Sequence, residues 1–184
     1  MLPPLAANPG VDYYYLNWLR MNTTIRQAQA EDIPTLVAII RTAFKKAADR
    51  LGLTAENSGH HASSITDTWV IEDMDEGVRY FIIEEGGVPA GAVTMEHARP
   101  EVCYIGRLSV LPDYQGRGLG HELLAFAIRE AAKTAADHAS IGVISDEKRL
   151  IEWYVRMGFT TNRQIKFEHF PFEVTLMRLQ LKEK

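Results

Sequence analysis

A glycine-rich turn at residues 115–120 constrains this chain more than any other stretch. It follows an apolar run from Tyr104 to Val110 that predicts a strand, and it precedes a helical pattern from about Leu119 to Ala136. Glycine at such a junction permits positive φ and lets a ligand approach the backbone closely. Because the first amides of a helix lack internal partners and carry the positive end of its dipole, this turn predicts a site for an anion such as pyrophosphate.

The spacing of the turn excludes two other phosphate-binding loops. It lacks the G-x-x-x-x-G-K-[ST] pattern, and it does not meet the G-x-G-x-x-G spacing of dinucleotide-binding folds. The pattern that fits is Q/R-x-x-G-x-G/A, with Gln115, Gly118 and Gly120 at the defined positions. The alternative is a plain tight turn between a strand and a helix.

The residues that flank the turn strengthen this interpretation. With Leu108-Ser109-Val110-Leu111-Pro112 before it and His121-Glu122-Leu123-Leu124 after it, the chain resembles the GNAT superfamily of N-acetyltransferases, which binds acetyl-CoA at this loop. The resemblance extends from about Thr23 to the C-terminus. It implies an α/β fold with a central mixed, mostly antiparallel sheet and helices on both faces. Strands 4 and 5 of that sheet splay apart, and acetyl-CoA, the cosubstrate, enters the gap.

The resemblance also implies which residues hold the cofactor. The backbone amides of the turn would bind the pyrophosphate, while backbone groups of the splayed strand would hold the pantetheine arm and the thioester oxygen. The Arg117 side chain would either pair with a phosphate or remain a solvated surface arginine. The expected cofactor-binding residues are Leu108, Ser109, Val110, Gln115, Gly116, Arg117, Gly118, Leu119 and Gly120.

Tyr154 is the expected catalytic residue. The segment Trp153-Tyr154-Val155-Arg156-Met157-Gly158-Phe159 resembles the family signature, in which an aromatic–Tyr pair precedes Gly-Phe. By that match Tyr154 would act as the general acid that protonates the CoA thiolate. A phenol titrates near ~10 and a thiol near ~8.5, so this transfer is only slightly uphill. The alternative is a core tyrosine on the apolar face of a helix.

The sequence departs from the family at two positions. Glu147 stands where many members have Asn, and a carboxylate cannot donate the hydrogen bonds of an amide. Tyr104 stands where histone-acetylating relatives have a Glu that acts as the general base. Glu101, Glu96 and His97 are nearby candidates for a general base, and the amine could equally arrive neutral.

His60 and His61 lie in a loop-like segment, Leu53 to Ser64, that the resemblance places over the acceptor pocket. Two histidines could contact the substrate, act as acid or base, or remain solvated. No matching Cys, Asp or Glu spacing supports a metal site, so no metal is expected.

The remaining patterns predict further helices and strands. The glycines at 86 and 87 predict a two-residue hairpin turn. Predicted helices span 31–50, 65–76 and 146–157, the last capped by Ser145 or Asp146. Predicted strands span 23–29, 79–85, 88–97, 102–110, 140–145, 160–167 and 173–181.

Composition limits the classes of function. The net charge of −4 and the pI near 5.9 argue against a nucleic-acid partner. The single Cys103 fits a reducing, cytoplasmic setting, and no apolar run is long enough for a membrane span. Residues 23–184 form one predicted domain. Residues 1–22 form an aromatic N-terminal extension that either docks on the domain or on a second subunit, as in a homodimer, or precedes a natural start at Met21.

These features predict an N-acetyltransferase. It would transfer the acetyl group of acetyl-CoA to a primary amine by direct attack. The acceptor would be a small-molecule amine or a peptide amine. The alternative is a catalytically inactive CoA-binding sensor or regulatory module with the same fold.

Overall fold

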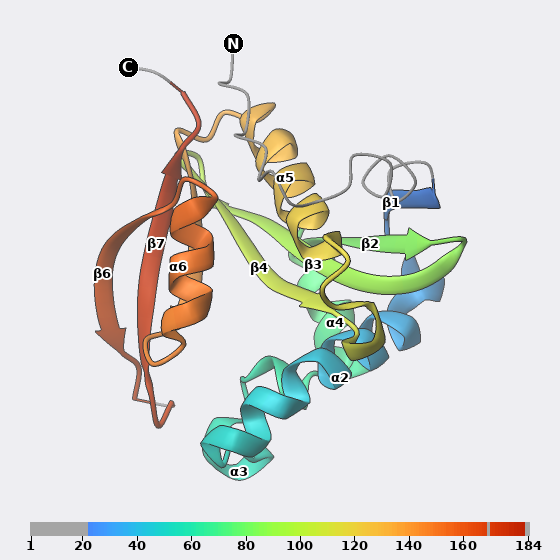
Figure 1. Cartoon of the computed structure of the whole chain (residues 1–184), viewed down its shortest axis with the longest axis horizontal. Coiled ribbons are helices and arrows are strands. Elements are labelled where there is room, and N and C mark those ends of the chain that lie inside the picture. The colour runs from blue at the N-terminus through green and yellow to red at the C-terminus, as the bar shows by residue number, and fades with distance from the viewer. Residues whose placement is uncertain (1–21, 169, 183–184) are drawn as a thin grey trace.

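A seven-stranded mixed sheet forms the centre of the computed structural model, which describes residues 22–168 and 170–182 (Figure 1). The expected extension, apart from Asn22, lies outside the described residues. The strand order is β1-β2-β3-β4-β5-β7-β6. The bounds are β1 Thr23–Gln27, β2 Arg79–Glu85, β3 Val88–Arg99, β4 Val102–Val110, β5 His138–Ile144, β6 Thr160–Lys166 and β7 Glu173–Gln180.

Neighbouring strands pair antiparallel except for β4 and β5, which run parallel. The predicted mixed, mostly antiparallel sheet is therefore confirmed. The turn between β2 and β3 consists of Gly86 and Gly87, whose φ angles are 61° and 80°. Two consecutive positive φ values define the tight hairpin that the glycine pair predicts.

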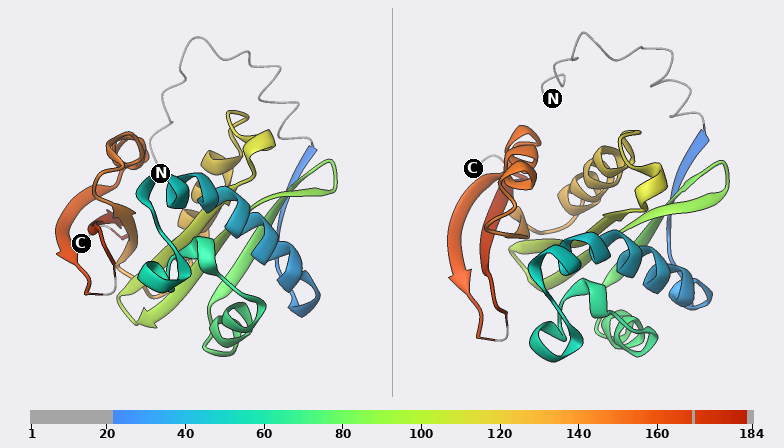
Figure 2. Two further views of the ribbon diagram at one scale, coloured as in Figure 1. Left: turned by 90° about the horizontal axis from the view of Figure 1, so that it is seen from below. Right: turned by 60° about the horizontal axis from the view of Figure 1, so that its bottom comes forward.

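Helices cover both faces of the sheet (Figure 2). The helix α2 and the short α4 pack on one face, and α5 and α6 pack on the other. The helical bounds are η1 Ala30–Asp32, α2 Ile33–Leu51, α3 Ala55–Ser58, η2 Ala62–Ser64, α4 Asp67–Asp75, η3 Pro112–Tyr114, α5 Leu119–Ala132 and α6 Lys148–Arg156. None of the helices in the described part of the chain is long and apolar enough to cross a membrane.

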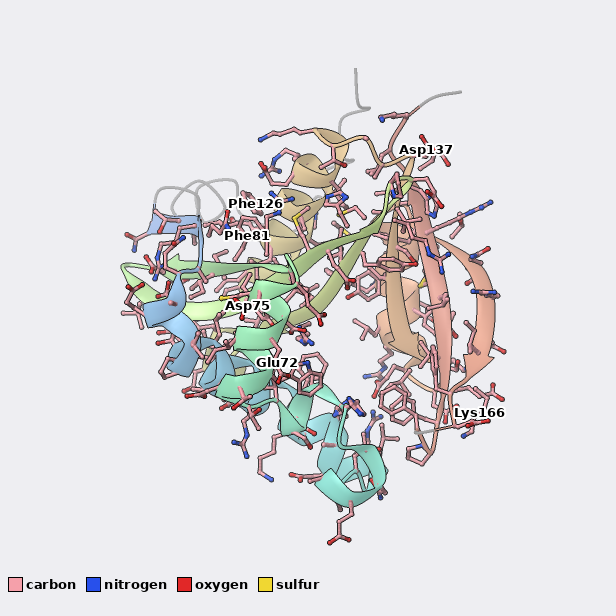
Figure 3. All side chains as sticks on the ribbon, turned by 180° about the vertical axis from the view of Figure 1, so that it is seen from behind. Glu72, Asp75, Phe81, Phe126, Asp137 and Lys166 are labelled. Carbon is pink, nitrogen blue, oxygen red and sulfur yellow. The ribbon has the colours of Figure 1, made fainter. Side chains whose placement is uncertain are left out.

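Each face of the sheet has its own hydrophobic core. On one face, α5 buries an apolar stripe that includes Leu123 and Ala127, and Phe126 meets Phe81 of β2 edge to face at 5.0 Å (Figure 3). On the other face, α2 buries Leu36 and Ile40 against the sheet. Because helices cover both faces of the sheet, the central residues of β2 are buried on both sides, and its sequence is a continuous apolar run instead of an alternating pattern.

The strands β4 and β5 pair only at their beginnings. The register joins Val102 to His138, Cys103 to Ala139 and Tyr104 to Ser140, and no pair follows. Beyond Tyr104 the two strands diverge, so the rest of β4 and β5 have open edges toward each other. This is the predicted splay between strands 4 and 5.

A bulge interrupts β4 where the gap opens. Between two register pairs, Ala92 with Ser109 and Thr94 with Gly106, β3 advances two residues and β4 advances three. The bulge therefore lies between Gly106 and Ser109 and contains Arg107. Arg107 has a φ of 45° and is the one described residue other than glycine with a positive φ. Such a bulge changes the direction of the backbone groups that follow it.

The structure corrects three sequence expectations. The segment predicted as a loop, 53–64, contains α3 and η2, because Thr54 and Asn57 form a reciprocal capping box. The helix α5 ends at Ala132, four residues before the predicted end. The helix α6 has Glu147 at its N-cap with no side-chain cap, since Ser145 instead hydrogen-bonds Thr175 at 2.8 Å.

Candidate active site

The glycine turn presents a row of unused hydrogen-bond donors. The amide N–H groups of residues 116–121 have no acceptor within the part of the chain that the structure describes, and the first helical bond at this end runs from Glu122 to Gly118. Gly116 and Gly118 have φ angles of 79° and 88°, which only glycine adopts readily. Six donors at the N-terminus of the 14-residue α5 form a geometry suited to a phosphate group.

The two flanking side chains brace the turn. Arg117 forms an ion pair with Glu85 at 2.8 Å, donates to the Asp113 carbonyl at 2.8 Å and lies over the Tyr114 ring. Gln115 donates from Nε2 to the Val110 carbonyl at 3.0 Å. Both side chains therefore fix the turn relative to β2 and β4, and the expected contact of Arg117 with a phosphate stays a prediction.

Three cavities follow one another from the turn through the gap. A pocket of about 280 Å³ lies against the glycine turn and Trp153, and it shares Val110 and Gln115 with a cleft of about 600 Å³ between β4 and β5. At its far end this cleft shares His60 and Phe170 with a third cavity of about 500 Å³. The series forms a path from the anion-binding turn, past the splayed strands, to the opposite end of the gap.

The open edge of β4 forms one wall of the cleft. Leu108, Ser109 and Val110 all line it. The amide of Leu111 donates to Ala90 of β3 at 2.9 Å, so by strand alternation the amide of Val110 faces away from β3 and toward the gap. The Ser109 hydroxyl is buried and donates to backbone carbonyls, including that of Ala92 at 3.2 Å. Backbone groups of this edge, rather than the serine side chain, are available to a ligand.

A partly buried polar cluster anchors the bulge. Arg107 forms an ion pair with Asp73 at 2.5 Å, and the Tyr80 hydroxyl donates to the same carboxylate oxygen at 2.5 Å. The guanidinium also lies 5.0 Å from the centre of the Trp69 ring. Burial raises the pKa of the Tyr80 phenol, which therefore stays protonated and can donate. The cluster ties β4 at its strained residue to β2 and α4.

Tyr154 of α6 is both a core residue and a cleft residue. Its ring is 7% exposed, packs on Trp153 and Phe159 and lines the cleft. Its hydroxyl has no hydrogen-bond partner among the described residues. Burial raises the pKa of the phenol, so the hydroxyl carries its proton at neutral pH. A protonated phenol beside the gap has the position and the ionisation state of a proton donor.

His60 and His61 line the cleft, but they differ in environment. His60 is exposed and meets Trp69 edge to face. His61 is 7% exposed, and desolvation lowers its pKa. The His61 Nδ1 accepts a hydrogen bond from the Ser63 amide at 3.3 Å, so the proton of the neutral ring lies on Nε2. His61 is therefore a neutral donor and a poor proton acceptor.

The four sequence candidates for a general base lie elsewhere. Glu96, His97, Glu101 and Tyr104 are absent from the described residues that line the cleft. Tyr104 pairs with Ser140 where β4 and β5 are still joined, so the opening begins beyond it. The structure therefore brings no candidate base carboxylate of β3 or β4 to the cleft.

Glu147 and Cys103 are two further residues that the sequence singles out. Glu147, at the position where family members often carry Asn, lines the cleft and is ion-paired with Arg50 of α2. Cys103 is fully buried, and burial raises its pKa to about 11, which fits a structural strand residue. Among the described residues there is no group of three or more His, Cys, Asp or Glu that could hold a metal ion.

The sequence interpretation missed an aromatic set at the far end of the cleft. Its members come from α2, α4 and the loop between β6 and β7, so no single stretch contains them. The one sequence signal is the dense Phe167-Glu-His-Phe170-Pro-Phe172 segment. The missed lining residues are Phe44, Trp69, Phe167, Phe170 and Phe172.

Comparison with known proteins gives the family. The Acetyltransferase (GNAT) family matches residues 46–159, which include the splayed strands, the glycine turn and Tyr154. The chain belongs to the GNAT family. Among curated proteins, it is 31% identical over 104 residues to an uncharacterized N-acetyltransferase of Methanocaldococcus jannaschii, a match that covers 53% of this chain and 45% of that protein.

A second curated relative is the mycothiol acetyltransferase of Streptomyces griseus, 33% identical over 84 residues, covering 45% of this chain and 27% of that protein. The chain thus spans less than half the length of either curated relative. Among solved structures, yncA of Salmonella typhimurium with its cofactor acetyl-CoA matches with a TM-score of 0.66 and 25% identity over 89% of this chain and 96% of that chain. The ribosomal-protein-S18-alanine N-acetyltransferase of Escherichia coli matches with a TM-score of 0.70 and 19% identity. The match covers 88% of this chain and 96% of that chain and shows a likeness of fold.

Proposed function

We propose that this chain is an acetyl-CoA-dependent N-acetyltransferase that transfers the acetyl group to a primary amine by direct attack. The observation that carries the proposal is the path from the six amides of the glycine turn, which have no acceptor among the described residues, into the cleft that Tyr154 lines. A pyrophosphate on the turn would direct the pantetheine arm along the open edge of β4. The likeness to yncA, which was solved with acetyl-CoA, supports this donor.

The residues of the cleft fit the chemistry of acyl transfer. The amine nitrogen attacks the thioester carbon, a C–N bond forms, the C–S bond breaks, and CoA leaves as a thiolate. Backbone donors such as the Val110 amide would stabilise the oxyanion, an effect commonly worth about 3 kcal/mol. Tyr154 would give its proton to the departing sulfur. The proton that the amine nitrogen loses would return to the Tyr154 phenolate through solvent.

The Tyr154 pKa does not argue against this role. Burial raises the pKa of the phenol, but the same desolvation acts on any thiolate formed beside it. Cys103 illustrates the effect within this chain, since burial raises its pKa to about 11. Burial therefore shifts the pKa values of the proton donor and the proton acceptor in the same direction.

The experiment has two parts. Calorimetry should detect acetyl-CoA binding to the full chain, and a thiol assay should detect CoA release with a panel of primary amines. None of the four candidate bases is among the described residues that line the cleft, which favours one alternative, a CoA-binding sensor without turnover. Tight acetyl-CoA binding with no CoA release from any amine would support that sensor and overturn the enzyme.

A further inference from the structure

The far end of the cleft differs in character from the end at the glycine turn. A chain of ring contacts crosses it from α2 to the loop after β6. Phe44 meets His61 at 5.7 Å, and His61 meets Phe172 at 6.1 Å, both edge to face. Phe172 then stacks on Phe170 at 4.8 Å. These rings connect α2 with the loop after β6 and give the far end of the cleft an aromatic lining, and we call this end the chamber.

The chamber lacks available charge. Only two charged side chains are among the described residues that line the cleft, and each has a partner: Arg107 pairs with Asp73, and Glu147 pairs with Arg50. His61 adds no charge at neutral pH, because desolvation lowers its pKa. A second ammonium or a carboxylate on an acceptor would therefore enter without a counter-ion, which is costly in an apolar site.

The outer cavity has the opposite character. It shares His60 and Phe170 with the chamber, and Glu56 and Glu168 line it as well. Both carboxylates are exposed, and neither forms an ion pair with a described residue. A mouth with two carboxylates attracts an ammonium ion from solvent, whereas the aromatic chamber behind it disfavours the charged form.

From this arrangement we propose that the acceptor is a small primary amine on a flat apolar body, such as an arylalkylamine. The proposal rests on the function proposed above and specifies the acceptor of the same site. The amine meets the carboxylates of the mouth as a cation. It then loses its proton to solvent as it enters the chamber, where desolvation favours the neutral form. Desolvation thus takes the role of a general base, since none of the four candidate bases is among the described residues that line the cleft.

The same geometry rejects other amines. A polyamine carries further ammonium groups into a chamber without free carboxylates. An amino acid carries a carboxylate that finds no free cation there. A protein N-terminus must pass His60 and Phe170, which line both the cleft and the outer cavity, with its chain attached. The chamber accepts an aromatic ring, in contrast, because edge-to-face and stacked contacts with several rings are available.

The test compares acceptors and variants. With acetyl-CoA in excess, CoA release is measured for 2-phenylethylamine, spermidine, phenylalanine and a short peptide with N-terminal Ala. We expect kcat/KM for 2-phenylethylamine to exceed that for each of the others by at least about 100-fold, since each of them buries an unpaired charge or a chain. Calorimetry with protein saturated with CoA measures binding of the same amines without turnover.

Two matched variants locate the effect. Phe172→Leu removes a ring face from the chamber but keeps an apolar side chain, and we expect the KM for 2-phenylethylamine to rise by up to about tenfold with acetyl-CoA affinity unchanged. Phe126→Leu makes the same change between α5 and β2, outside the cleft (Figure 3), and should leave that KM unchanged.

The outcomes separate the two proposals. Preference for spermidine, the amino acid or the peptide overturns the acceptor class while the acetyltransferase function stands. Binding of 2-phenylethylamine without CoA release supports the acceptor class and overturns the function. If acetyl-CoA binds but 2-phenylethylamine neither binds nor reacts, the acceptor class is wrong. Equal KM values for Phe172→Leu and Phe126→Leu would overturn the aromatic chamber as the site of recognition.

Discussion

Tyr154→Phe is the sharpest perturbation of the proposed mechanism, because it removes one hydroxyl and keeps the ring. The ring is 7% exposed and packs on Trp153 and Phe159, and these contacts remain in the variant. The hydroxyl has no partner among the described residues, so its removal leaves no group unsatisfied. We therefore expect the free energy of unfolding to change by less than about 1 kcal/mol, and acetyl-CoA affinity to hold.

Turnover should respond strongly. One general acid commonly contributes ~10²- to 10⁴-fold, which corresponds to roughly 3–5 kcal/mol of activation free energy. The assay is CoA release at saturating acetyl-CoA and amine, so kcat is measured apart from binding. Tyr104→Phe is the matched control. It removes the same hydroxyl at a position outside the described lining of the cleft, and its kcat should equal that of the wild type.

The pH profile adds a second readout. Since burial raises the pKa of Tyr154 above its ordinary value near ~10, the phenol should stay protonated up to that pH, and the wild-type kcat should not fall through loss of this proton below pH ~10. Near wild-type turnover in Tyr154→Phe would refute the role of general acid. A variant that unfolds would assign Tyr154 to the core instead.

Three further predictions test other parts of the site. Gly118→Asp should abolish measurable acetyl-CoA binding in calorimetry with the fold retained. Gly118→Ala introduces the same backbone strain at φ 88° but adds no carboxylate, so it should keep part of the affinity. Asp73→Ala should lower the free energy of unfolding in urea by about 1–3 kcal/mol, because it leaves the partly buried Arg107 without its ion-pair partner. An unchanged free energy of unfolding would show that this pair does not stabilise the fold. The pKa of His61 in the folded state lies below the unfolded value near ~6.5, so the unfolded state binds this proton first and wild-type stability should fall as pH drops below ~6.5. The free energy of unfolding should fall more steeply with pH in the wild type than in His61→Asn. Parallel curves for the two proteins would show that His61 does not contribute.

Much of the fold could be predicted from local sequence signals. The period of apolar residues locates β4 and the start of α5, and the glycine pair at 86 and 87 locates a hairpin with the predicted φ signs. These signals act within a few residues, where backbone sterics and burial decide the structure. The same holds for the anion-binding turn, whose glycines adopt positive φ as their residue type suggests.

The parts that could not be predicted depend on contacts between distant segments. The N-cap of α6 is Glu147 and not a short polar residue, and it is ion-paired with Arg50, which lies about a hundred positions earlier. The aromatic chamber joins rings from helices and a hairpin loop that only the folded chain brings together. The candidate bases Glu96, His97, Glu101 and Tyr104 lie close to the cleft strand in sequence, but none of them is among the described residues that line the cleft.

The bulge at Arg107 explains how such distant contacts bear on the site. A residue other than glycine in the left-handed region costs roughly 1–2 kcal/mol, so its φ of 45° requires compensation. The ion pair with Asp73 and the contact of the guanidinium with the Trp69 ring supply stabilising interactions that suit the planar side chain of Arg. The bulge redirects the open edge of β4 at the point where the cleft begins. Strain at one residue, held by a partly buried cluster, thus sets the direction of the backbone donors that would meet the thioester in the proposed function.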